Sequence, residues 1–484
     1  MNKKLLRLIF LCLAFVSIFS CKKLIEIEET DFIDADLALK TVPNTEQAVI
    51  GAYAALGNEM GIQLNGVFSD ELKPGDFYVS TSTHEWQYTS NDIGIRDNYT
   101  ATTAYYYVVD RVNRVLKALP DAVAINQAEE ALRNRVKGEA LFLRAFCHFE
   151  LFRYYCDNYS AEGLGMPYVE EPSLTSLARI KMGPYFEKIE ADIAEAKNLL
   201  PNNLTDVFRA TRLAAFGLHA RLALYKRDWA AAIANSTEYI NGIPLATGTG
   251  FERIWKDSTA NEIAFKLKRT TANRIGSFYR GLFTKNAAGQ FIAPTNILWI
   301  PSDKLWNTYD QTNDIRFKAY LINEPVLAAT PNKPSKIVNK YSGSGYATNN
   351  ENVADLKLFR TAEMYLIRAE ARAETGAISG AGSAEADVNT LRAARITGYT
   401  NVAFASKDIA INAIIQERYK ELAFEGHRFW DLKRRGLPVT RLASDAPTPA
   451  GLTLPAGNFR FLLPIPQVEI LANALMEQNP GYTN

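Results

Sequence analysis

The sequence predicts a mainly α protein in which pairs of helices form a superhelical scaffold and carry a loop-rich, irregular ligand-binding face with a few short strands. Three observations lead to this prediction. Apolar residues recur with helical spacing through most of the chain. Proline and glycine lie where several of these stretches begin or end. From Gly242 to Leu356 the helical pattern stops, and Gly, Pro, Asn and Ser become dense.

The first helices are expected after residue 41. Val49, Ala52, Tyr53 and Leu56 have the i, i+3, i+4, i+7 spacing of one helical face. The same pattern runs from Tyr105 to Leu119, and Pro120 should end that helix.

The longest expected helix runs from about Gln127 to Asn158 and carries two apolar stripes, so it should be buried between neighbouring helices. It contains Cys147 and Cys156, which are nine residues apart. This spacing corresponds to about 13 Å along a helix, too far for a disulfide. We therefore expect two buried thiols.

The remaining helices are expected in pairs. Residues Arg212 to Ile240 are similar to a tetratricopeptide unit, with a short break at Arg227 and Asp228 and small residues that allow close packing. The other expected helices are an amphipathic helix from Pro184 to Leu200, a pair formed by Phe359–Ala373 and Glu385–Arg395, and a helix from Ile409 to Phe424. The irregular spacing predicts degenerate repeats and not a regular solenoid.

The irregular region has one strand signal, because Ile263, Phe265 and Leu267 alternate with other residues. Its many aromatic residues argue against disorder; they are Tyr279, Phe283, Phe291, Trp299, Trp306 and Tyr309. Long irregular stretches in compact domains are usually functional or disordered, so we expect a functional region here.

The N-terminus predicts export. Lys3, Lys4 and Arg7 precede an apolar stretch from Leu8 to Ser20, which is too short to span a bilayer, and Cys21 follows. We predict a signal peptide over residues 1–20, acylation of Cys21 by a chain such as palmitate, and a lipidated tether over residues 21–41. The alternative is an ordinary cleaved signal with a chance cysteine.

Charge and motifs exclude several classes of protein. The 54 basic and 53 acidic residues nearly balance, so nucleic acid is not an expected partner. The four histidines form no metal-binding motif, and nucleotide-binding and hydrolase motifs are missing, so we expect no metal, cofactor or catalytic residue. Glu417, Glu421 and Glu425 share one helical face. They could serve a glycan hydrolase, but acid and nucleophile must flank a substrate, so an ion-pair network with the nearby arginines is favoured.

Aromatic residues in a polar loop, Asp70 to Asn98, suggest a binding face for a glycan or a peptide. The candidate ligand-binding residues are Tyr78, Trp86, Tyr88, Asp76 and Arg96 from this loop, with Tyr279 and Trp299 from the irregular region. The alternative is that these rings only cover the helical core.

Several segments together resemble the SusD/RagB family of outer-membrane nutrient-binding lipoproteins. They are the signal with Cys21, NTEQAVIGAYAAL at 44–56, GEALFLRAFCHFELF at 138–152, LFRTAEMYLIRAEARA at 358–373, ERYKELAFEGHRFWDLKRRG at 417–436 and FLLPIPQVEILANALMEQNPGY at 461–482. They follow the family's order over nearly the whole mature chain.

The resemblance implies about four tetratricopeptide-like helix pairs in one compact unit, with an N-terminal helical region at 42–260 and a C-terminal region at 261–484. It implies a lipid-anchored protein at the cell surface that binds glycans, or in some cases peptides, without cleaving them. It also implies a SusC-like TonB-dependent transporter as the partner. The family's ligand residues lie in variable loops, so none can be carried over to this chain.

Overall fold

The computed structural model describes residues 38–482 apart from 58, 78–80, 91, 273, 275, 344 and 346. The expected signal peptide, the acylated Cys21 and the candidate ligand residue Tyr78 lie outside the described residues. Within the described part of the chain, no helix combines the length and the hydrophobicity needed to cross a bilayer.

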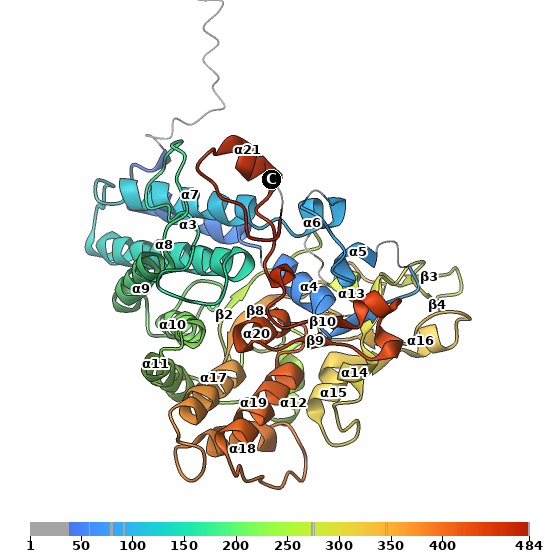
Figure 1. Ribbon diagram of the computed structural model, residues 1–484. Helices are drawn as coiled ribbons and strands as arrows, with labels where there is room; N and C mark the ends of the chain where they lie inside the picture. Colours follow the sequence, from blue (N-terminus) through green and yellow to red (C-terminus); the bar gives the residue numbers. More distant parts are fainter. Residues whose placement is uncertain are drawn as a thin grey trace, which may run out of the picture.

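Paired helices form the scaffold, as predicted. The pairs are α3 (Val42–Ala55) with α7 (Thr102–Ala118), α8 (Gln127–Tyr155) with α9 (Met182–Leu199), α10 (Arg212–Lys226) with α11 (Trp229–Gly242), and α17 (Thr361–Glu374) with α18 (Ala384–Ala393). Contacts of α7 with α8, α9 with α10 and α11 with α17 join successive pairs. The helices therefore stack from the top to the bottom of the left side in Figure 1. Helix α19 (Lys407–Glu421) packs on α17.

Local sequence explains where these helices begin. The Asn126 side chain accepts a hydrogen bond from the Glu129 amide at 3.0 Å, and the Glu129 carboxylate accepts one from the Ile125 amide at 3.0 Å. This reciprocal capping satisfies backbone donors that a helix start leaves free. The side chains of Thr211 and Asp228 cap α10 and α11, each by accepting a hydrogen bond from one backbone amide.

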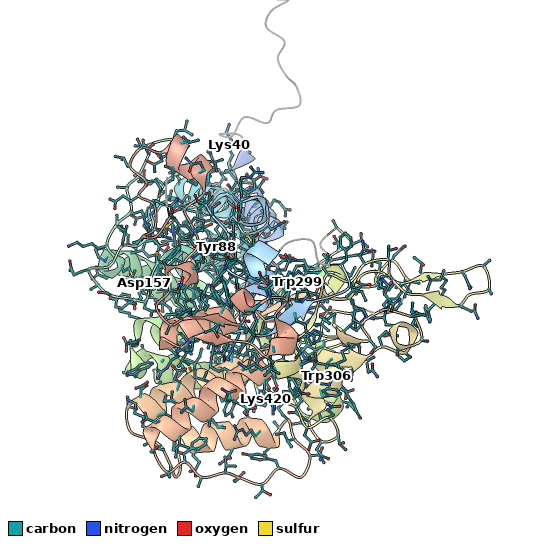
Figure 2. All side chains as sticks on the ribbon, turned by 45° about the vertical axis from the view of Figure 1, so that its right-hand side comes forward. Lys40, Tyr88, Asp157, Trp299, Trp306 and Lys420 are labelled. Carbon is teal, nitrogen blue, oxygen red and sulfur yellow. The ribbon has the colours of Figure 1, made fainter. Side chains whose placement is uncertain are left out.

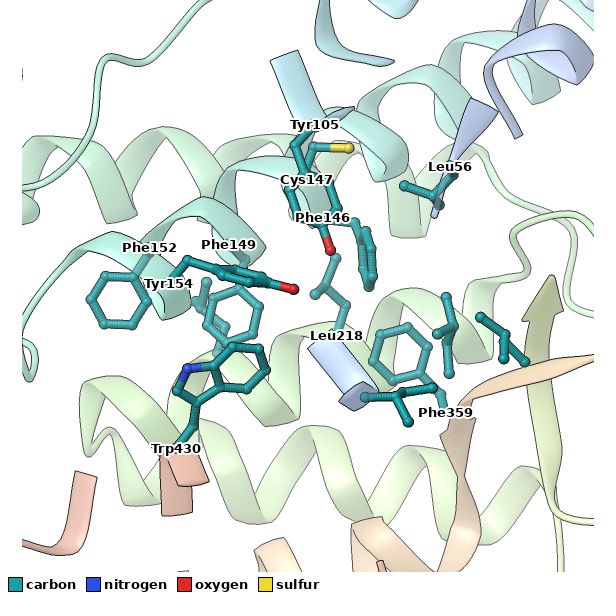
Figure 3. Packing of buried hydrophobic residues seen from close by; sticks show 14 of the residues in the cluster. Leu56, Tyr105, Phe146, Cys147, Phe149, Phe152, Tyr154, Leu218, Phe359 and Trp430 are labelled. Atoms are coloured by element: carbon teal, nitrogen blue, oxygen red, sulfur yellow. The ribbon is translucent and has the colours of Figure 1, made fainter. Parts of the chain in front are cut away.

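The core lies between the helix pairs and is rich in aromatic residues. Helix α8 is buried on all sides over its second half, as its two apolar stripes predicted. Figure 3 shows Phe146, Phe149 and Phe152 of α8 packed among residues from neighbouring elements, including Phe359 and Trp430. Cys147 and Cys156 are buried free thiols, as expected.

The predicted strand at Ile263–Leu267 is confirmed as β2, and it pairs antiparallel with β8 (Leu356–Arg360). Both strands are buried along their whole length. The prediction that a helix begins at Phe359 is therefore wrong at its start, because Phe359 and Arg360 pair with β2 and α17 begins at Thr361. Burial of the Phe359 side chain is common to both conformations, so the apolar pattern could not separate them.

Short elements fill the right side of Figure 1. The helices outside the scaffold are α4 (Glu59–Phe68), α5 (Thr81–His84), α6 (Ile93–Asn98), α12 (Gly248–Ile254), α13 (Gly276–Arg280), α14 (Asp303–Trp306), α15 (Ile315–Tyr320), α16 (Pro325–Ala328), α20 (Arg428–Arg435) and α21 (Gln467–Ala472), with 3-10 turns at Ala443–Asp445, Pro449–Gly451 and Phe459–Phe461. The two-stranded pairings are β1 (Leu72–Pro74) with β5 (Trp299–Pro301), β3 (Thr284–Lys285) with β4 (Phe291–Ile292), β6 (Leu321–Asn323) with β7 (Lys336–Val338), and β9 (Val439–Thr440) with β10 (Thr453–Leu454). We call the part formed by residues 70–98 and 276–338 the loop lobe.

Candidate functional site

The structure brings together the two segments in which ligand residues were predicted. Strand β1 pairs with β5, so that Pro74 lies opposite Trp299. The pairing continues past β1, because the Gly75 amide donates to the Leu298 carbonyl at 2.8 Å and the Phe77 amide to the Ile297 carbonyl at 3.3 Å. In Figure 2, Trp299 lies where the N-terminal blue segment meets the yellow segment.

Asp76 stabilises the contact between the segment after β1 and the segment before β5. One carboxylate oxygen accepts a hydrogen bond from the Ile297 amide at 2.7 Å, and the other pairs with the Lys333 ammonium. The Asp76 carboxylate therefore already has partners from two other segments of the loop lobe. Its geometry is that of a structural contact, although the residue was predicted as a ligand-binding side chain.

Trp86 and Tyr88, two of the candidate ligand-binding residues, are core residues instead of exposed members of a binding face. Trp86 is 3% exposed; its indole N–H donates to the Phe68 carbonyl at 3.1 Å, and the Arg441 guanidinium lies 4.2 Å above its ring. Tyr88 is 1% exposed and packs between Phe68 and Tyr482. A ligand cannot stack on rings that are covered on both faces, so the alternative reading, that the rings cover the core, holds for this pair.

Tyr279, a third candidate ligand-binding residue, is also buried and not exposed to a ligand. It has no exposed surface, and its ring packs on Tyr341 and Phe424 with centroid distances of 6.1 and 5.7 Å. Its hydroxyl is buried without a hydrogen-bond partner among the described residues. Tyr279 therefore joins the loop lobe to the segment that follows α19.

Trp299 lies at the border between the core and the surface. It is 9% exposed, and its ring lies between His84 and Phe278 at centroid distances of 5.4 and 6.2 Å. Phe278 is only partly buried. Burial, followed by the nearby Arg441 charge, lowers the pKa of His84 to about 2, so this imidazole is neutral at physiological pH. The three rings form an aromatic row whose outer member, Phe278, reaches solvent.

The exposed side chains of the loop lobe are different from most of those predicted. Phe77 is 41% exposed, and Leu282, Phe291 and Ile292 have similar exposure. Arg96 is exposed on α6, which packs on α5 next to His84. An exposed ring suits stacking on a sugar, and an exposed guanidinium suits hydrogen bonding to its hydroxyl groups. Sequence alone offered no signal to separate Phe77 from the buried rings around it.

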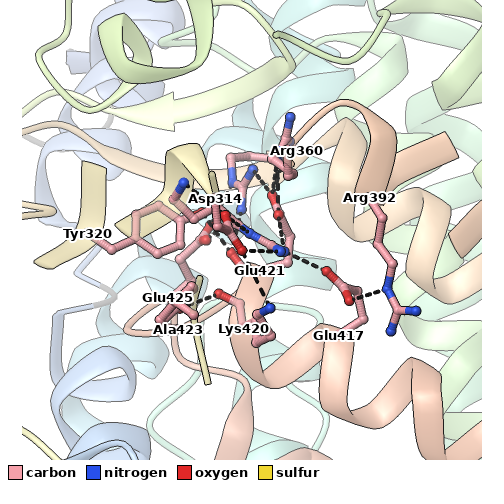
Figure 4. A network of polar contacts seen from close by, with 12 residues as sticks. Asp314, Tyr320, Arg360, Arg392, Glu417, Lys420, Glu421, Ala423 and Glu425 are labelled. Atoms are coloured by element: carbon pink, nitrogen blue, oxygen red, sulfur yellow. Dashed lines mark hydrogen bonds and ion pairs between the residues drawn. The ribbon is translucent and has the colours of Figure 1, made fainter. Parts of the chain in front are cut away.

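Glu417 and Glu421 of α19, with Glu425 beyond its end, lie in a buried ion-pair network, the kind of arrangement that was favoured. Helix α19 ends at Glu421 and not at Phe424 as predicted, and the cations come from other elements instead of from the nearby arginines. Figure 4 shows carboxylates of Glu417, Glu421 and Glu425 facing cations from other elements. The pairs are Arg316 with Asp314, Glu417 and Glu421, Arg395 with Glu262 and Glu421, Arg360 with Glu262, Glu421 and Glu425, Lys340 with Glu425, and Arg392 with Glu417. We call these residues the charged network.

Electrostatics in the charged network oppose acid catalysis. Burial alone would raise the pKa of Glu421, but the charges of Arg395, Arg360 and Arg316 lower it to about 2. The pKa of Glu417 is likewise lowered to about 2 against the effect of burial, mainly by Arg316. A general acid for glycoside cleavage needs a raised pKa, and these carboxylates are ionised and covered.

Two cavities lie near the start of the described chain. One, of about 530 Å³, is lined by residues that include Leu39, Lys40 and Arg114. The other, of about 500 Å³, lies between α7, residues 167–177 and the C-terminal segment, and also contacts Arg114. Large apolar side chains are exposed around them. They are Val123, Ile125, Leu174, Val468, Leu471 and Leu475, each more than half exposed. We call this region the tether end; it lies at the top of Figure 1.

Comparison with known proteins agrees with this architecture. A family model described as "Starch-binding associating with outer membrane" matches residues 33–224, and the model of the SusD family matches residues 329–482. The SusD-like protein P2 of Formosa agariphila is 26% identical over 92% of this chain and 93% of its own.

Solved structures show the same fold. A SusD superfamily protein from Bacteroides thetaiotaomicron has a TM-score of 0.76 at 22% identity, covering 91% of this chain and all of its own. A laminarin-binding SusD-like protein has a TM-score of 0.71 at 21% identity, covering 92% of this chain and all of its own. With matches of both family models across most of its length, this chain belongs to the SusD family.

Proposed function

We propose that this protein is a lipid-anchored, cell-surface glycan-binding protein that captures an oligosaccharide and delivers it, uncleaved, to a SusC-like TonB-dependent transporter of the outer membrane. The observation that carries the proposal is the exposed aromatic surface of the loop lobe in a protein of a starch-binding family. Acylation of Cys21 would hold the protein at the membrane, since a doubly or triply acylated chain is stably anchored.

The residues of the loop lobe that reach the surface support glycan capture. Phe77 supplies an apolar ring face, Phe278 extends the aromatic row to solvent, and Arg96 can donate to hydroxyl groups. The pairing of β1 with β5, continued by the bond from the Phe77 amide to the Ile297 carbonyl, holds the backbone of Phe77 close to that of Trp299, and such ordering before binding reduces the entropy lost on binding. Ligand specificity would then be set by loops carried on a fixed scaffold.

Phe77→Ala tests the glycan surface. Loss of one stacking ring should weaken binding by about 0.5–1.5 kcal/mol, or roughly two- to thirteenfold. The assay is calorimetric titration of a soluble form that begins after Thr30 with neutral glycans and mixed peptides. Tyr107→Ala, which removes a half-exposed ring of α7, is the matched control and should leave affinity unchanged. Unchanged affinity in Phe77→Ala would remove Phe77 from the site, and binding of peptides alone would favour the peptide-binding alternative.

The tether end supports contact with a partner in the membrane. Exposed apolar side chains surround cavities next to the point where the chain leads to the anchor, and none of the α21 residues is buried. Contiguous exposed apolar surface is typical of protein interaction sites. Co-purification of the transporter with the lipoprotein from outer membranes would support delivery; glycan binding without any associated transporter would reduce the role to capture.

A glycan hydrolase remains the rival hypothesis, and product formation tests it. The buried, ion-paired carboxylates of α19 argue against it. Incubation of bound oligosaccharides with the protein should leave their length unchanged. Product release that is lost in Glu421→Gln would overturn the non-catalytic assignment.

A further inference from the structure

A small polar cavity lies far along the scaffold from the tether end. It has a volume of about 290 Å³ and lies where the turn between α10 and α11 meets the ends of α17 and α20. Arg227, Trp229, Glu374 and Arg435 line it. The volume is at the lower end of that of small-molecule sites, which suits a compact ligand unit. None of its lining residues belongs to the loop lobe or the charged network.

The charges around this cavity favour an anion. Arg227 is exposed, and its guanidinium donates to the Arg434 carbonyl at 3.2 Å. No carboxylate of the described residues forms an ion pair with it. A guanidinium has five N–H donors in a planar fork, so most of its donors remain available to a ligand.

The carboxylate in the cavity is already occupied. Glu374 pairs with Arg435 at 2.7 Å and with Lys407 at 2.5 Å. Burial alone would raise the pKa of Glu374, but hydrogen bonds from Lys407 and Arg435 lower it, so it stays ionised and neutralises part of their charge. Arg435 also pairs with Glu370 at 3.3 Å, so its charge is balanced, and Arg227 is the cation of the lining that has no carboxylate partner among the described residues. The nearby Asp228 carboxylate caps α11 by accepting from the Ala231 amide at 3.0 Å.

Trp229 adds an apolar face beside these cations. It is the first residue of α11 and is only partly buried against the core. The preceding Arg227 has a left-handed conformation, with φ of 62°, which ends α10 and begins the turn to α11. This turn places both side chains in one cavity. A flat ring next to guanidinium groups can bind a ligand that has an apolar face and a negative charge.

We propose that this cavity is a second saccharide site for an acidic sugar, whose carboxylate or sulfate is held by Arg227 and Arg435 and whose apolar ring face lies on Trp229. The choice of a saccharide over other anions rests on the proposed glycan capture. The site would retain acidic branches or ends of a polysaccharide whose neutral part binds the loop lobe.

Arg227→Ala tests this site in the full-length lipoprotein in detergent. Calorimetry would compare an oligogalacturonate, a sulfated galacto-oligosaccharide and a neutral galacto-oligosaccharide of equal length. We expect the variant to bind acidic oligosaccharides at least about tenfold more weakly, since charge-assisted hydrogen bonds contribute about 1.5–3 kcal/mol. Arg227→Lys, which keeps the charge, should retain part of the affinity. Arg212→Ala, which removes another exposed arginine of α10, should change nothing.

The outcomes separate this inference from the proposed function. Preference for galacturonate or for the sulfated sugar would identify the acidic group, and dependence of either on Arg227 supports the site. Failure of both acidic sugars to bind, or equal affinity in Arg227→Ala, would overturn it. Loss of neutral-sugar binding in Phe77→Ala concerns only the loop lobe, so either site can fail while the other stands.

Discussion

Replacement of Glu421 by Gln removes the central negative charge of the charged network while keeping the side-chain shape. Glu421 has no exposed surface. Its carboxylate accepts hydrogen bonds from Arg316 at 3.1 Å, from Arg360 at 3.2 Å and from Arg395 at 3.1–3.2 Å. The amide of Gln can accept from one of these groups, but its NH₂ would face guanidinium donors.

The expected loss of unfolding free energy depends on the ion pairs that remain in Glu421→Gln. The other carboxylates of the network still face Arg316, Arg360 and Arg395, so the cations keep some partners. Removing the sole partner of a buried charge typically costs about 3–5 kcal/mol, so the cost in Glu421→Gln should lie at or below this range because the three cations keep other carboxylates. A domain has about 5–15 kcal/mol of stability in total. We therefore expect a folded variant with a much reduced free energy of unfolding.

Urea unfolding at pH 7, followed by circular dichroism, measures the loss. Glu195→Gln is the control, since the pair between Glu195 and Lys137 is about half exposed and should contribute less than about 1 kcal/mol. A loss in Glu421→Gln no larger than that of the control would refute the view that the network stabilises the fold. Glycan affinity of the folded variant should equal that of the unchanged protein.

Acid titration of Glu421→Gln and of the unchanged protein gives a second test of the network. The folded-state pKa of Glu421, about 2, lies below its ordinary value of 4.5. The carboxylate therefore contributes stability that is complete above about pH 4.5 and is lost as the pH falls towards 2. Glu421→Gln should have a shallower loss of stability over this interval, and equal slopes would contradict the assignment.

Two further predictions concern buried groups of the loop lobe. Burial raises the pKa of Glu71 from its ordinary 4.5 to about 8. Between these two pH values the folded protein keeps a proton that the unfolded chain releases, so the free energy of unfolding falls as the pH rises from about 4.5 to about 8. Glu71→Gln should therefore be more stable than the unchanged protein at pH 8.5 and similar at pH 5; a constant difference would argue against this titration. Tyr279→Phe removes a buried, unpartnered hydroxyl, so it should preserve or raise stability by up to about 1–3 kcal/mol and leave glycan affinity intact. A drop in glycan affinity would show that Tyr279 contributes to ligand binding.

Helical periodicity made most of the scaffold predictable. The helix pairs bury one or more faces against each other, so apolar residues recur at helical spacing in the sequence. The same reasoning identified part of the charged network, because Glu417 and Glu421 share a face of α19, and buried carboxylates need cations. The expected partners were the nearby arginines, which was wrong, because the cations Arg316, Arg360 and Arg395 come from distant segments.

The ligand face was predictable only as a region. Pairing of β1 with β5 unites the two segments that were chosen, although their residues lie more than 200 positions apart in the sequence. Trp86 and Phe77 are both aromatic residues of one polar loop, yet their exposed fractions are 3% and 41%. The difference depends on Arg441 and Phe68, which contact Trp86 from outside the loop, and no local pattern encodes those contacts.

The shortness of its elements explains why the loop lobe uses so many rings and charges internally. Strands of two or three residues satisfy few backbone groups, so side chains must replace the missing ladder bonds. At the border of the lobe Arg441 donates to the carbonyls of Val67, Ser69, His84 and Gly451, and inside the lobe Asp76 accepts from the Ile297 amide. Polar and aromatic residues in such a lobe are therefore mostly structural. Under the proposed function, ligand recognition falls to exposed side chains of the lobe such as that of Phe77.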